Sequence, residues 1–576
     1  MLTSYSTPGV YVQEIPTLAP SVAPVATAIP VFIGYTKKGP ALVPTRIDTL
    51  LDYENLFGGA NPSAFSVKVE DNPINGLPPT LTITRTDATS NPFLMYYGLS
   101  LYFQNGGGSC YILSIGDYKT TPAKSKFEDA LTALEKEDEP TLIVLLDAVA
   151  LTATEAGYYA LCRIALDQCH TLGDRFLLVD IPKSSSPETF RSSSTFGNNY
   201  LSYAAAYYPY LNTTLNYLYE EEKISISDLR KKPVTTTVPT TSDSVKWSSD
   251  ISGITVSYTG AAGDAPSVII TADAAGDISE FDTSGKNTLA IKISSTKAPT
   301  ATELADAWSN WKTAKGNSAK GFDIVFTGND KTVVTAAPSQ QLTQTPKEQV
   351  SDSNKTESLT LAELKQNNTS LYNQIKSSLA NQRVTLPPSP AIAGVYASVD
   401  RDRGVWKSPA NVSLNAVLGP DTKISDTRQD YLNIDPDAGK SINAIRSFTG
   451  KGTLVWGGRT LAGNDNEWRY VSVRRLFINI EESTRKASAF AVFEPNDATT
   501  WLKVKAMIES YLYGLWQQGA MAGSKPESAY FVSVGLGKTM TAQDILEGRM
   551  IVNIGVAAVR PAEFIILCFS HKMQEA

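Results

Sequence analysis

Two cysteines and a histidine form the one cluster of soft metal ligands in this sequence. Cys162, Cys169 and His170 lie close together, but six residues separate the cysteines, which is not the CxxC spacing of a zinc site. The segment LCRIALDQCHTLGD has the pattern of a single amphipathic helix, and no second pair of ligands follows it. We therefore expect no metal site.

Two glycine-containing segments match parts of phosphate-binding loops. In GLGKTM, residues Gly537, Lys538 and Thr539 match the end of such a loop, but the pattern needs a glycine where this chain has Val532. The run QNGGGSC at 104–110 lacks the acidic residue that a dinucleotide fingerprint places about twenty positions on. We expect a β-turn at the first segment, a helix end at the second, and no bound cofactor.

Acid–base catalysis has no convincing set of residues. Carboxylates occur in pairs at Glu481 with Glu482 and at Asp400 with Asp402, but paired surface acids are common. The chain has two histidines, so few residues could act as the imidazole base that many hydrolase mechanisms need. The sequence predicts no catalytic residue, and we expect that the protein is not an enzyme.

Charge and cysteine content exclude further classes of protein function and location. The 576 residues carry 51 Lys and Arg against 58 Asp and Glu, a net charge of −7, which offers no basic footprint for nucleic acid. Four cysteines cannot form a disulfide framework in a chain of this length, and they indicate a reducing compartment. The N-terminal residues lack the pattern of a signal peptide, and no apolar run is long enough to span a bilayer. We expect neither export by that route nor membrane insertion.

The elements that would position any site fall into three regions. From 25 to 231, short β-like runs alternate with helical patterns, which is typical of an α/β layer, with a small β insertion at about 61–91. Residues 232–385 are rich in Thr and Ser and predict an inserted, mainly β domain of sandwich or jelly-roll type, followed by a flexible connector. The globular pattern returns over 386–576. The fold class we expect is an α/β (α+β) core assembled from both chain ends, with the β domain inserted between them.

The C-terminal region has the clearest local patterns. SVRRLFINIEESTRKASAFAVFE and WLKVKAMIESYLYGLWQQGAM have helical spacing, with Pro495 between them and Asn496 or Asp497 able to cap the second helix. AYFVSVGL, RMIVNIGVAAV and AEFIILCFSH follow and are typical of strands. We expect two stacked helices and a chain that ends in a closing strand.

The N-terminal arm, residues 1–24, has a β-like piece followed by a proline-rich stretch. It has too little apolar content to fold alone, and one interpretation is a tail that lies on its own domain. The alternative is a strand donated to the sheet of another subunit. We favour donation because a polar tail usually lacks β-branched and aromatic residues such as Val10, Tyr11, Val12 and Ile15.

Four motifs together point to a known family. They are TPGVYVQEIP, LYFQNGGGSCYILSIG, RRLFINIEESTRKASAFAVFEPND and VRPAEFIILCFSHK. In combination they resemble the sheath proteins of contractile phage tails and related contractile injection systems. The resemblance covers about residues 1–60, 92–230 and 386–576, and it leaves out the Thr/Ser-rich middle.

The resemblance implies a structural subunit that polymerises as a helical stack of rings, sixfold in the family, around an inner tube. Contraction drives the tube through a target envelope. Partners would be further copies of the chain, the tube protein, and baseplate and terminator proteins. The particle would be assembled in the bacterial cytoplasm and would be a phage tail (a virion component) or an extracellular or cell-anchored device.

In the family, the N-terminal arm and the C-terminal strand of each subunit join sheets of neighbouring subunits. Carried over to this chain, the exchanged residues are Pro8, Gly9, Val10, Tyr11, Val12 and Ile15 with Glu563, Phe564, Ile565, Ile566, Leu567 and Phe569. The proline-rich segment 16–30 would supply a hinge. The extended assembly would be metastable, so contraction needs no nucleotide hydrolysis.

Basic helix faces are candidates for weak contacts with the tube. The residues are Arg474, Arg475, Arg485, Lys486, Lys503 and Lys505. They could equally be solvated charges or members of ion pairs.

The alternative function is a monomeric α/β enzyme or carbohydrate-binding protein with a β-sandwich appendage, which would sediment as a single chain.

Overall fold

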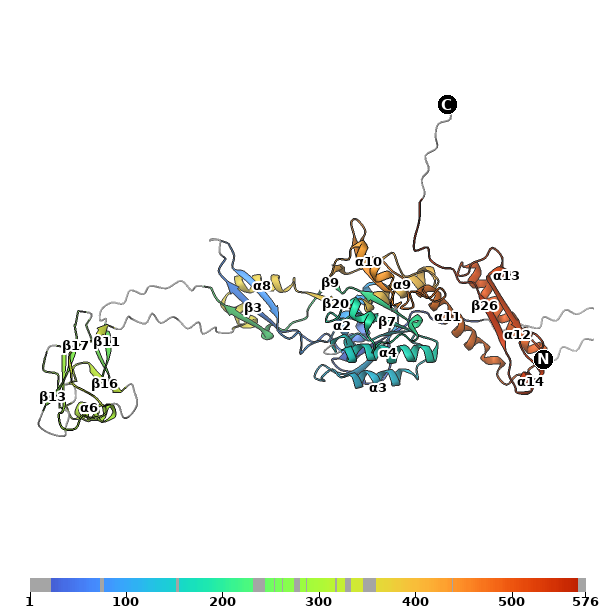
Figure 1. The fold of residues 1–576 in the computed structure, drawn as a ribbon. Helices are drawn as coiled ribbons and strands as arrows, with labels where there is room; N and C mark the ends of the chain where they lie inside the picture. Colours follow the sequence, from blue (N-terminus) through green and yellow to red (C-terminus); the bar gives the residue numbers. More distant parts are fainter. Residues whose placement is uncertain are drawn as a thin grey trace, which may run out of the picture. The chain divides into compact units, whose positions relative to one another are not determined.

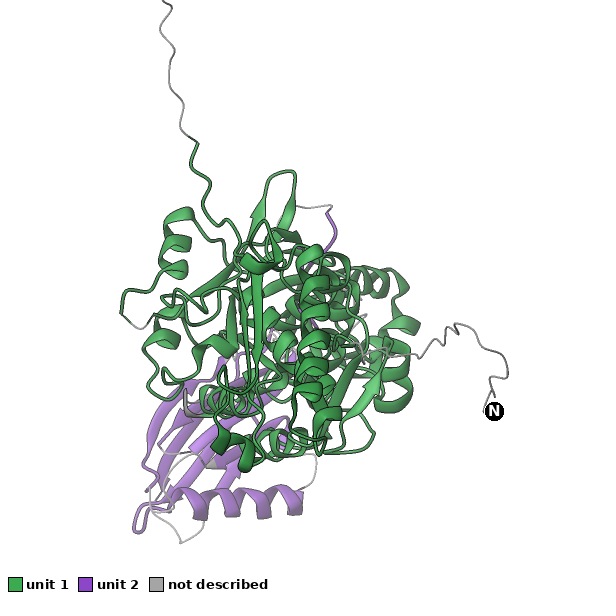
Figure 2. Cartoon of the chain, turned by 90° about the vertical axis from the view of Figure 1, so that its right-hand side faces the viewer, with its two compact units in different colours: residues 1–68, 81–226, 359–576 green, residues 69–80, 227–358 purple. Residues whose placement is uncertain are grey.

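A computed structural model describes residues 22–567 of the chain apart from 73–76, 152–154, 231–243, 253, 262, 274–279, 286, 316–318, 327–332, 345–358 and 438. The chain divides into two compact units, coloured separately in Figure 2. Unit 1 comprises Met1–Lys68, Leu81–Ile226 and Leu359–Ala576, and unit 2 comprises Val69–Thr80 and Ser227–Ser358. Unit 1 is thus built from chain segments on both sides of unit 2.

A nine-stranded sheet forms the centre of unit 1 (Figure 1). Its order is β2 (Thr45–Ile47), β5 (Cys110–Asp117), β1 (Pro30–Thr36), β6 (Leu142–Val144), β7 (Phe176–Asp180), β8 (Ala204–Tyr208), β23 (Ile442–Phe448), β24 (Gly452–Val455) and β21 (Val412–Ser413). The strands from β5 to β23 pair in parallel. Ile442 of β23 pairs with Ala206 of β8, so strands from before and after unit 2 share one sheet. The predicted α/β core assembled from both chain ends is confirmed.

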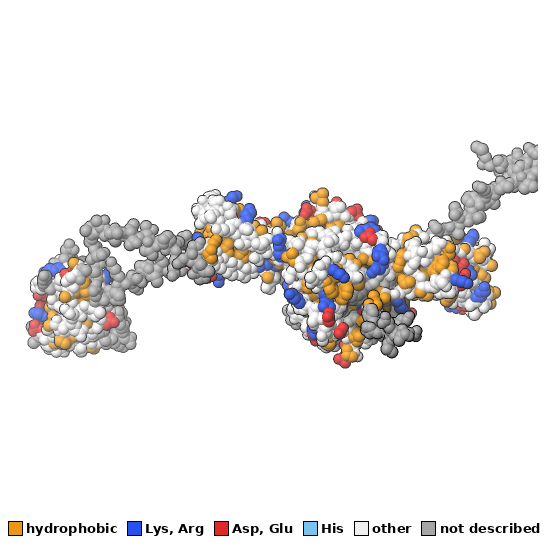
Figure 3. Space-filling view, turned by 90° about the horizontal axis from the view of Figure 1, so that it is seen from above, with side chains coloured by type: hydrophobic (Ala, Val, Ile, Leu, Met, Phe, Trp, Pro, Cys, Tyr) orange, Lys and Arg blue, Asp and Glu red, His pale blue; other side chains and the backbone are white. Residues whose placement is uncertain are grey.

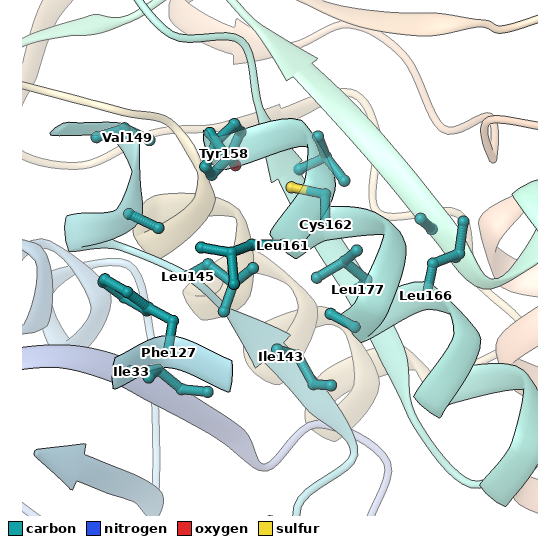
Figure 4. Close-up of a cluster of buried hydrophobic side chains, with 14 of the residues drawn as sticks. Ile33, Phe127, Ile143, Leu145, Val149, Tyr158, Leu161, Cys162, Leu166 and Leu177 are labelled. Atoms are coloured by element: carbon teal, nitrogen blue, oxygen red, sulfur yellow. The ribbon is translucent and has the colours of Figure 1, made fainter. Parts of the chain in front are cut away.

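Helices cover both faces of this sheet. The bounds are α3 (Lys124–Leu134) and α4 (Glu155–Leu172) on one face, and α1 (Leu50–Phe57), α2 (Met95–Gln104) and α9 (Ser389–Arg403) on the other. Along β1, Val31 and Ile33 point into the first cluster and Phe32 into the second, as expected for a strand buried on both faces. Figure 4 shows Ile33 with Phe127 and Leu161 in the first cluster. Each such side chain contributes about 1.5–3 kcal/mol by burial.

Two buried carboxylates hold helix starts against the sheet. Asp180, in β7, accepts hydrogen bonds from the backbone N–H (2.9 Å) and hydroxyl (2.5 Å) of Ser389 at the start of α9. Asp147 accepts from the N–H groups of Leu94 (2.7 Å), before α2, and Tyr35 (2.8 Å), in β1. Burial raises the pKa of each carboxyl to about 7. The two helices are therefore positioned by acids deep in the core.

Smaller elements of unit 1 surround the central sheet. One further sheet has the order β19 (Leu359–Thr360), β10 (Ile224–Asp228), β3 (Phe65–Glu70) and β4 (Thr80–Arg85), and another has the order β20 (Arg383–Leu386), β9 (Leu211–Asn216) and β22 (Val417–Pro420). The remaining helices here are α5 (Pro187–Ser192), α7 (Leu361–Asn367), α8 (Thr369–Leu379) and α10 (Asp426–Asn433). Residues 359–385 belong to unit 1, so the inserted unit ends at 358 and not at the predicted 385.

Within its described residues, unit 2 has two four-stranded sheets and a helix. The first has the order β16 (Phe322–Phe326), β12 (Ile254–Ala261), β11 (Ser244–Ile251) and β18 (Thr343–Gln344), and the second β14 (Glu280–Asp282), β15 (Thr288–Ser294), β13 (Ser267–Asp273) and β17 (Ala337–Gln341). The helix α6 (Ala301–Lys315) buries Leu304 and Trp308 in the core of the unit. The sequence interpretation missed α6, although the spacing of these two residues by one helical turn marks its buried face. It also placed β17 and β18 in the flexible connector.

A separate small core lies in the C-terminal part of unit 1. It is built from α11 (Val471–Ser488), α12 (Ala498–Gln517), α13 (Pro526–Ala529), α14 (Ala542–Leu546), β25 (Tyr530–Val534) and β26 (Val552–Val556). Asp497 caps α12 by accepting a hydrogen bond from the N–H of Thr500 (3.0 Å), which confirms the predicted pair of helices. No helix in the described residues is long and apolar enough to cross a membrane.

Candidate assembly surface

The most exposed apolar run in the described C-terminal part is the tail Phe564–Leu567. Its side chains are 68%, 80%, 84% and 72% exposed in chain order. The predicted closing strand is not formed here: residues 560–567 lie in no strand of this chain. A strand exists only when its backbone groups pair with a neighbouring edge, and the tail pairs with no strand of the described residues. Phe569 and the N-terminal candidates Pro8–Ile15 lie outside the described residues.

The small C-terminal core contains a sheet of only two strands. β25 and β26 pair antiparallel from Tyr530 with Val556 to Val534 with Val552, and no third strand of the described chain joins them. Phe531 is 60% exposed and none of the residues of β26 is fully buried. Two-stranded sheets are marginally stable alone, and an unpaired edge can template a further strand. This sheet can therefore accept strands.

Glu563, directly before the exposed tail, is held by its own chain. Arg459 donates to both carboxylate oxygens, at 2.9 Å from Nε to Oε1 and 2.6 Å from Nη2 to Oε2. Asn433 (2.8 Å) and the hydroxyl of Tyr470 (3.3 Å) donate to the same carboxylate. Burial by itself raises the pKa of this carboxyl, but the hydrogen bonds from Arg459 and Asn433 outweigh burial and hold the pKa below its ordinary value. The carboxylate is thus charged and clamped.

Two of the six basic candidates are buried inside the chain. The guanidinium of Arg474 lies over the rings of Tyr203 and Trp468, 4.3 and 4.5 Å from their centroids. Arg475 forms an ion pair with Asp400 (2.5 Å) in which both side chains are buried. Neither arginine is presented to a surface, because this polar face of α11 packs against α9 and the core. Helical spacing alone did not reveal that packing.

The other four basic candidates lie at the surface of α11 and α12. Arg485 and Lys486 pair with Glu482 at 2.7 and 3.0 Å, and Lys505 pairs with Glu509 at 3.6 Å. Lys503 is exposed. Over the face in Figure 3, Lys and Arg side chains are mixed with Asp and Glu, so no large surface of one sign appears there. The exposed pair of Lys505 with Glu509 contributes at most about 1 kcal/mol, whereas the carboxylate of Glu482 is buried and is held by both of its cations.

The sequence segments weighed for chemistry have structural explanations. Cys162 and Cys169 are buried in the core, His170 stacks on Tyr200 with ring centroids 3.7 Å apart, and the described residues contain no cluster of metal ligands. The GLGKTM segment is a turn in which the N–H of Lys538 bonds the carbonyl of Gly535 (3.2 Å). The glycine run at 106–108 links the end of α2 to β5.

Comparison with known proteins relates the C-terminal part to one family. Residues 463–570 match the phage tail sheath C-terminal domain, a stretch that includes α11, α12, the two-stranded sheet and the exposed tail. The tail sheath protein of Vibrio phage KVP40 is 27% identical over 136 residues, which are 24% of this chain and 20% of that protein. The chain thus spans about a fifth of the length of this curated relative.

Solved structures extend the likeness to nearly the whole chain. A chain of the anti-feeding prophage baseplate, solved with 6-fold symmetry, aligns over 99% of this chain and 100% of its own length, with 27% identity and a TM-score of 0.54. The chain is thus similar to contractile sheath proteins over nearly its whole length. A chain of the contracted PVC sheath complex, from an extracellular contractile injection system, aligns over 99% of both chains with 26% identity and a TM-score of 0.52.

Sequence reasoning missed the residues that anchor the tail. The resemblance to the sheath family placed Glu563 in the exchanged strand, and the sequence analysis did not single out Arg459 or Asn433. Their partnership spans 104 and 130 positions in the chain, so no local pattern could signal it. The one available signal was a carboxylate at the start of an otherwise uncharged strand.

Proposed function

We propose that the protein is the subunit of a contractile sheath that polymerises helically around an inner tube and contracts to drive the tube through a target envelope. The observation that carries this proposal is an exposed apolar tail, clamped at Glu563, in a chain whose small C-terminal sheet has two strands. A β-prone segment that pairs with no strand of its own chain is stabilised when it joins the sheet of another copy. A contact of this kind that repeats without closing builds a helical polymer.

The exchanged segments are the N-terminal arm and the tail. In the arm the strand comprises Pro8–Tyr11 with Val12 and Ile15, and in the tail it runs from Phe564 through Leu567 to Phe569. Glu563 is an anchor within its own subunit and is not part of the exchanged strand. The arm occupies residues 1–24, and the core is formed by 25–231 and 386–576, with the preceding segment 359–385 packed in the same unit.

The wider assembly follows from the same contact. Rings of six subunits stack around the tube protein and end at baseplate and terminator proteins, which is supported by the likeness to a baseplate chain solved with 6-fold symmetry. Unit 2 decorates the outside. The energy of contraction resides in metastable packing between subunits, without an enzyme activity or cofactor. The particle is assembled in the bacterial cytoplasm and belongs to a phage tail or an injection device.

The exposed basic residues make the weak contacts with the tube. They are Arg485, Lys486, Lys503 and Lys505. The pair of Lys505 with Glu509 is solvent-exposed and costs little to break, whereas Arg485 and Lys486 are exposed but pair with Glu482, whose side chain is only 9% exposed. Such contacts can release together when the sheath contracts.

Negative-stain electron microscopy of the purified chain tests the proposal. The variants are a deletion of residues 1–20 and the double substitution Ile565→Asp with Ile566→Asp. The matched control is Leu51→Asp, because Leu51 is 63% exposed, lies in the first turn of α1, and is far from the tail in sequence. We expect regular tubes from the wild type and the control, and short or no tubes from the two variants.

Two results would contradict the proposal. If the wild type forms only discrete particles of one chain over a range of salt and protein concentration, helical polymerisation is refuted. Normal tubes from the double aspartate variant would show that the tail does not enter a sheet, since two charges in a paired apolar strand prevent its burial.

A further inference from the structure

Three side chains along one stripe of α11 bind the main chain of the segment 22–28. Arg475 donates to the carbonyl of Thr27 (2.7 Å), and Asn479 donates to the carbonyl of Val25 (3.0 Å). The hydroxyl of Ser483 accepts from the N–H of Val25 (3.1 Å). Positions four residues apart lie above one another on a helix, so these groups form a ladder parallel to its axis. The segment is therefore fixed in register along α11.

A buried acid from α9 closes this ladder at one end. Asp400 accepts from Arg475 at 3.0 and 2.5 Å and from the hydroxyl of Thr27 at 2.5 Å. Both members of the ion pair are buried, so separation would leave an unpaired charge in the interior. The root of the N-terminal arm is thus attached to two helices, so residues 25–27 of the predicted hinge 16–30 are fixed within the single chain.

The root of the C-terminal tail is attached at the beginning of the same helix. Tyr470 is the residue directly before α11, and its hydroxyl donates to Glu563. Arg459, which holds the same carboxylate, also forms an isolated β-bridge with Tyr470. The two roots therefore meet the helix at 470 and at 475–483.

The helix between these points is firmly embedded. Val471 and Ile478 pack in the core of the nine-stranded sheet, whereas Leu476 and Ile480 pack in the small C-terminal core. An α-helix packed on two sides transmits displacement along its length, whereas an unpaired chain segment does not.

We propose that α11 is the common attachment point of both exchanged segments, which we call the mooring. A mechanical load that enters a subunit through its N-terminal arm then leaves through its C-terminal tail by way of this helix. The proposal rests on the proposed strand exchange between sheath subunits. Glu563, Asn479 and Ser483 are positioning residues: they fix where each exchanged segment begins. The two attachments are links in series, because breaking either one interrupts the same path.

The C-terminal clamp is tested first on the unassembled full chain. Glu563→Ala removes the carboxylate, Glu563→Gln keeps a neutral acceptor and restores part of the contact, and Glu509→Ala is the control for loss of an exposed ion pair. We expect chymotrypsin to cleave after Phe564 about tenfold faster in Glu563→Ala, at an intermediate rate in Glu563→Gln, and at the wild-type rate in the control. A rate in Glu563→Ala equal to that of wild type would overturn the clamp.

The series arrangement is tested in assembled tubes. The variants are Glu563→Ala, the pair Asn479→Ala with Ser483→Ala, and all three substitutions together. Ser488→Ala, at the exposed end of α11, is the matched control. After contraction is triggered by mild denaturant, fragments and intact tubes are counted by electron microscopy, and thermal unfolding of each unassembled variant measures its stability. We expect a severalfold rise in fragments for either attachment, with the triple variant no worse than the worse of the two.

The outcomes separate the mooring from the proposed function. Absence of tubes from the wild type refutes the proposed function, and the mooring with it. Tubes from the wild type with unchanged fragmentation in both variants refute the mooring alone. Additive fragmentation in the triple variant shows two independent anchors, which contradicts a single path through α11. Fragmentation that follows the loss in thermal stability, with Glu563→Gln no better than Glu563→Ala, assigns these residues a merely structural role and also refutes the mooring.

Discussion

The nine-stranded sheet and the two-stranded sheet of unit 1 represent two ways of completing a sheet. In the first, β1 has paired neighbours on both edges and helices on both faces, and its seven residues are all buried. In the second, β25 and β26 pair only with each other among the described strands, side chains of the sheet pack against α12, and every residue of β26 keeps some exposure. The central strands of the first sheet are thus paired and covered within one chain.

The difference teaches where the chain depends on other copies. A sheet that is paired and covered contributes its full burial to folding of the single chain. A two-stranded sheet gains stability only when further strands or another surface cover it. Substitutions in the first sheet should therefore act on unfolding of the chain, and those in the second on assembly.

The largest effect on chain stability is expected from Phe32→Ala. Phe32 is fully buried between β5, α2 and the rest of the second cluster, and its ring contacts that of Tyr102 at 5.1 Å between centroids. Loss of the ring leaves a cavity that costs about 3–5 kcal/mol in the free energy of unfolding. Calorimetry of the unassembled chain measures this as a lower transition temperature for unit 1. A loss below about 1 kcal/mol would mean that the central sheet is not the self-sufficient region.

The same contrast explains what the sequence could predict. Alternating apolar runs and helical spacing are local, so the α/β core and the pair α11 and α12 could be predicted. The cap at Asp497 could be predicted because its partner is three residues away. The burial of Arg475 could not, since its partner Asp400 lies 75 positions earlier in the chain. For the tail, apolar content predicted a closing strand, but residues 560–567 form no strand, because they pair with no edge of the described chain.

A medium effect, dependent on pH, is expected from Asp180→Asn. Burial raises the pKa of Asp180 to about 7 in the folded chain, above its value in the unfolded chain. The stabilisation from the protonated acid is therefore complete below the unfolded pKa, near 4, and is lost as the pH rises through about 7. Asparagine stays neutral and can still accept a hydrogen bond from Ser389, so the variant should lack this loss.

Thermal unfolding of wild type and Asp180→Asn between pH 5 and pH 8 measures the effect. We expect the transition temperature of the variant, relative to that of the wild type, to rise by roughly a few degrees as the pH rises from 5 to 8. Asp147→Asn should behave in the same direction, because burial raises that pKa to about 7 as well. A difference that is constant over this pH range would show that the carboxylate is ionised throughout.

The smallest effect on the unassembled chain is expected from Phe531→Ala, which removes the same ring as Phe32→Ala from the other sheet. Phe531 pairs across the strands with Gly555 and is 60% exposed, so the substitution removes one cross-strand contact. Such a contact contributes about 0.2–1 kcal/mol, and calorimetry should show a shift close to the experimental error. If strands from other copies complete this sheet, the same ring becomes covered on assembly, and its loss should raise the protein concentration needed for tube formation several-fold. A fall in chain stability as large as that of Phe32→Ala would remove the distinction between the two sheets. An unchanged concentration for tube formation would show that the exposed face of β25 is not covered by a neighbouring subunit.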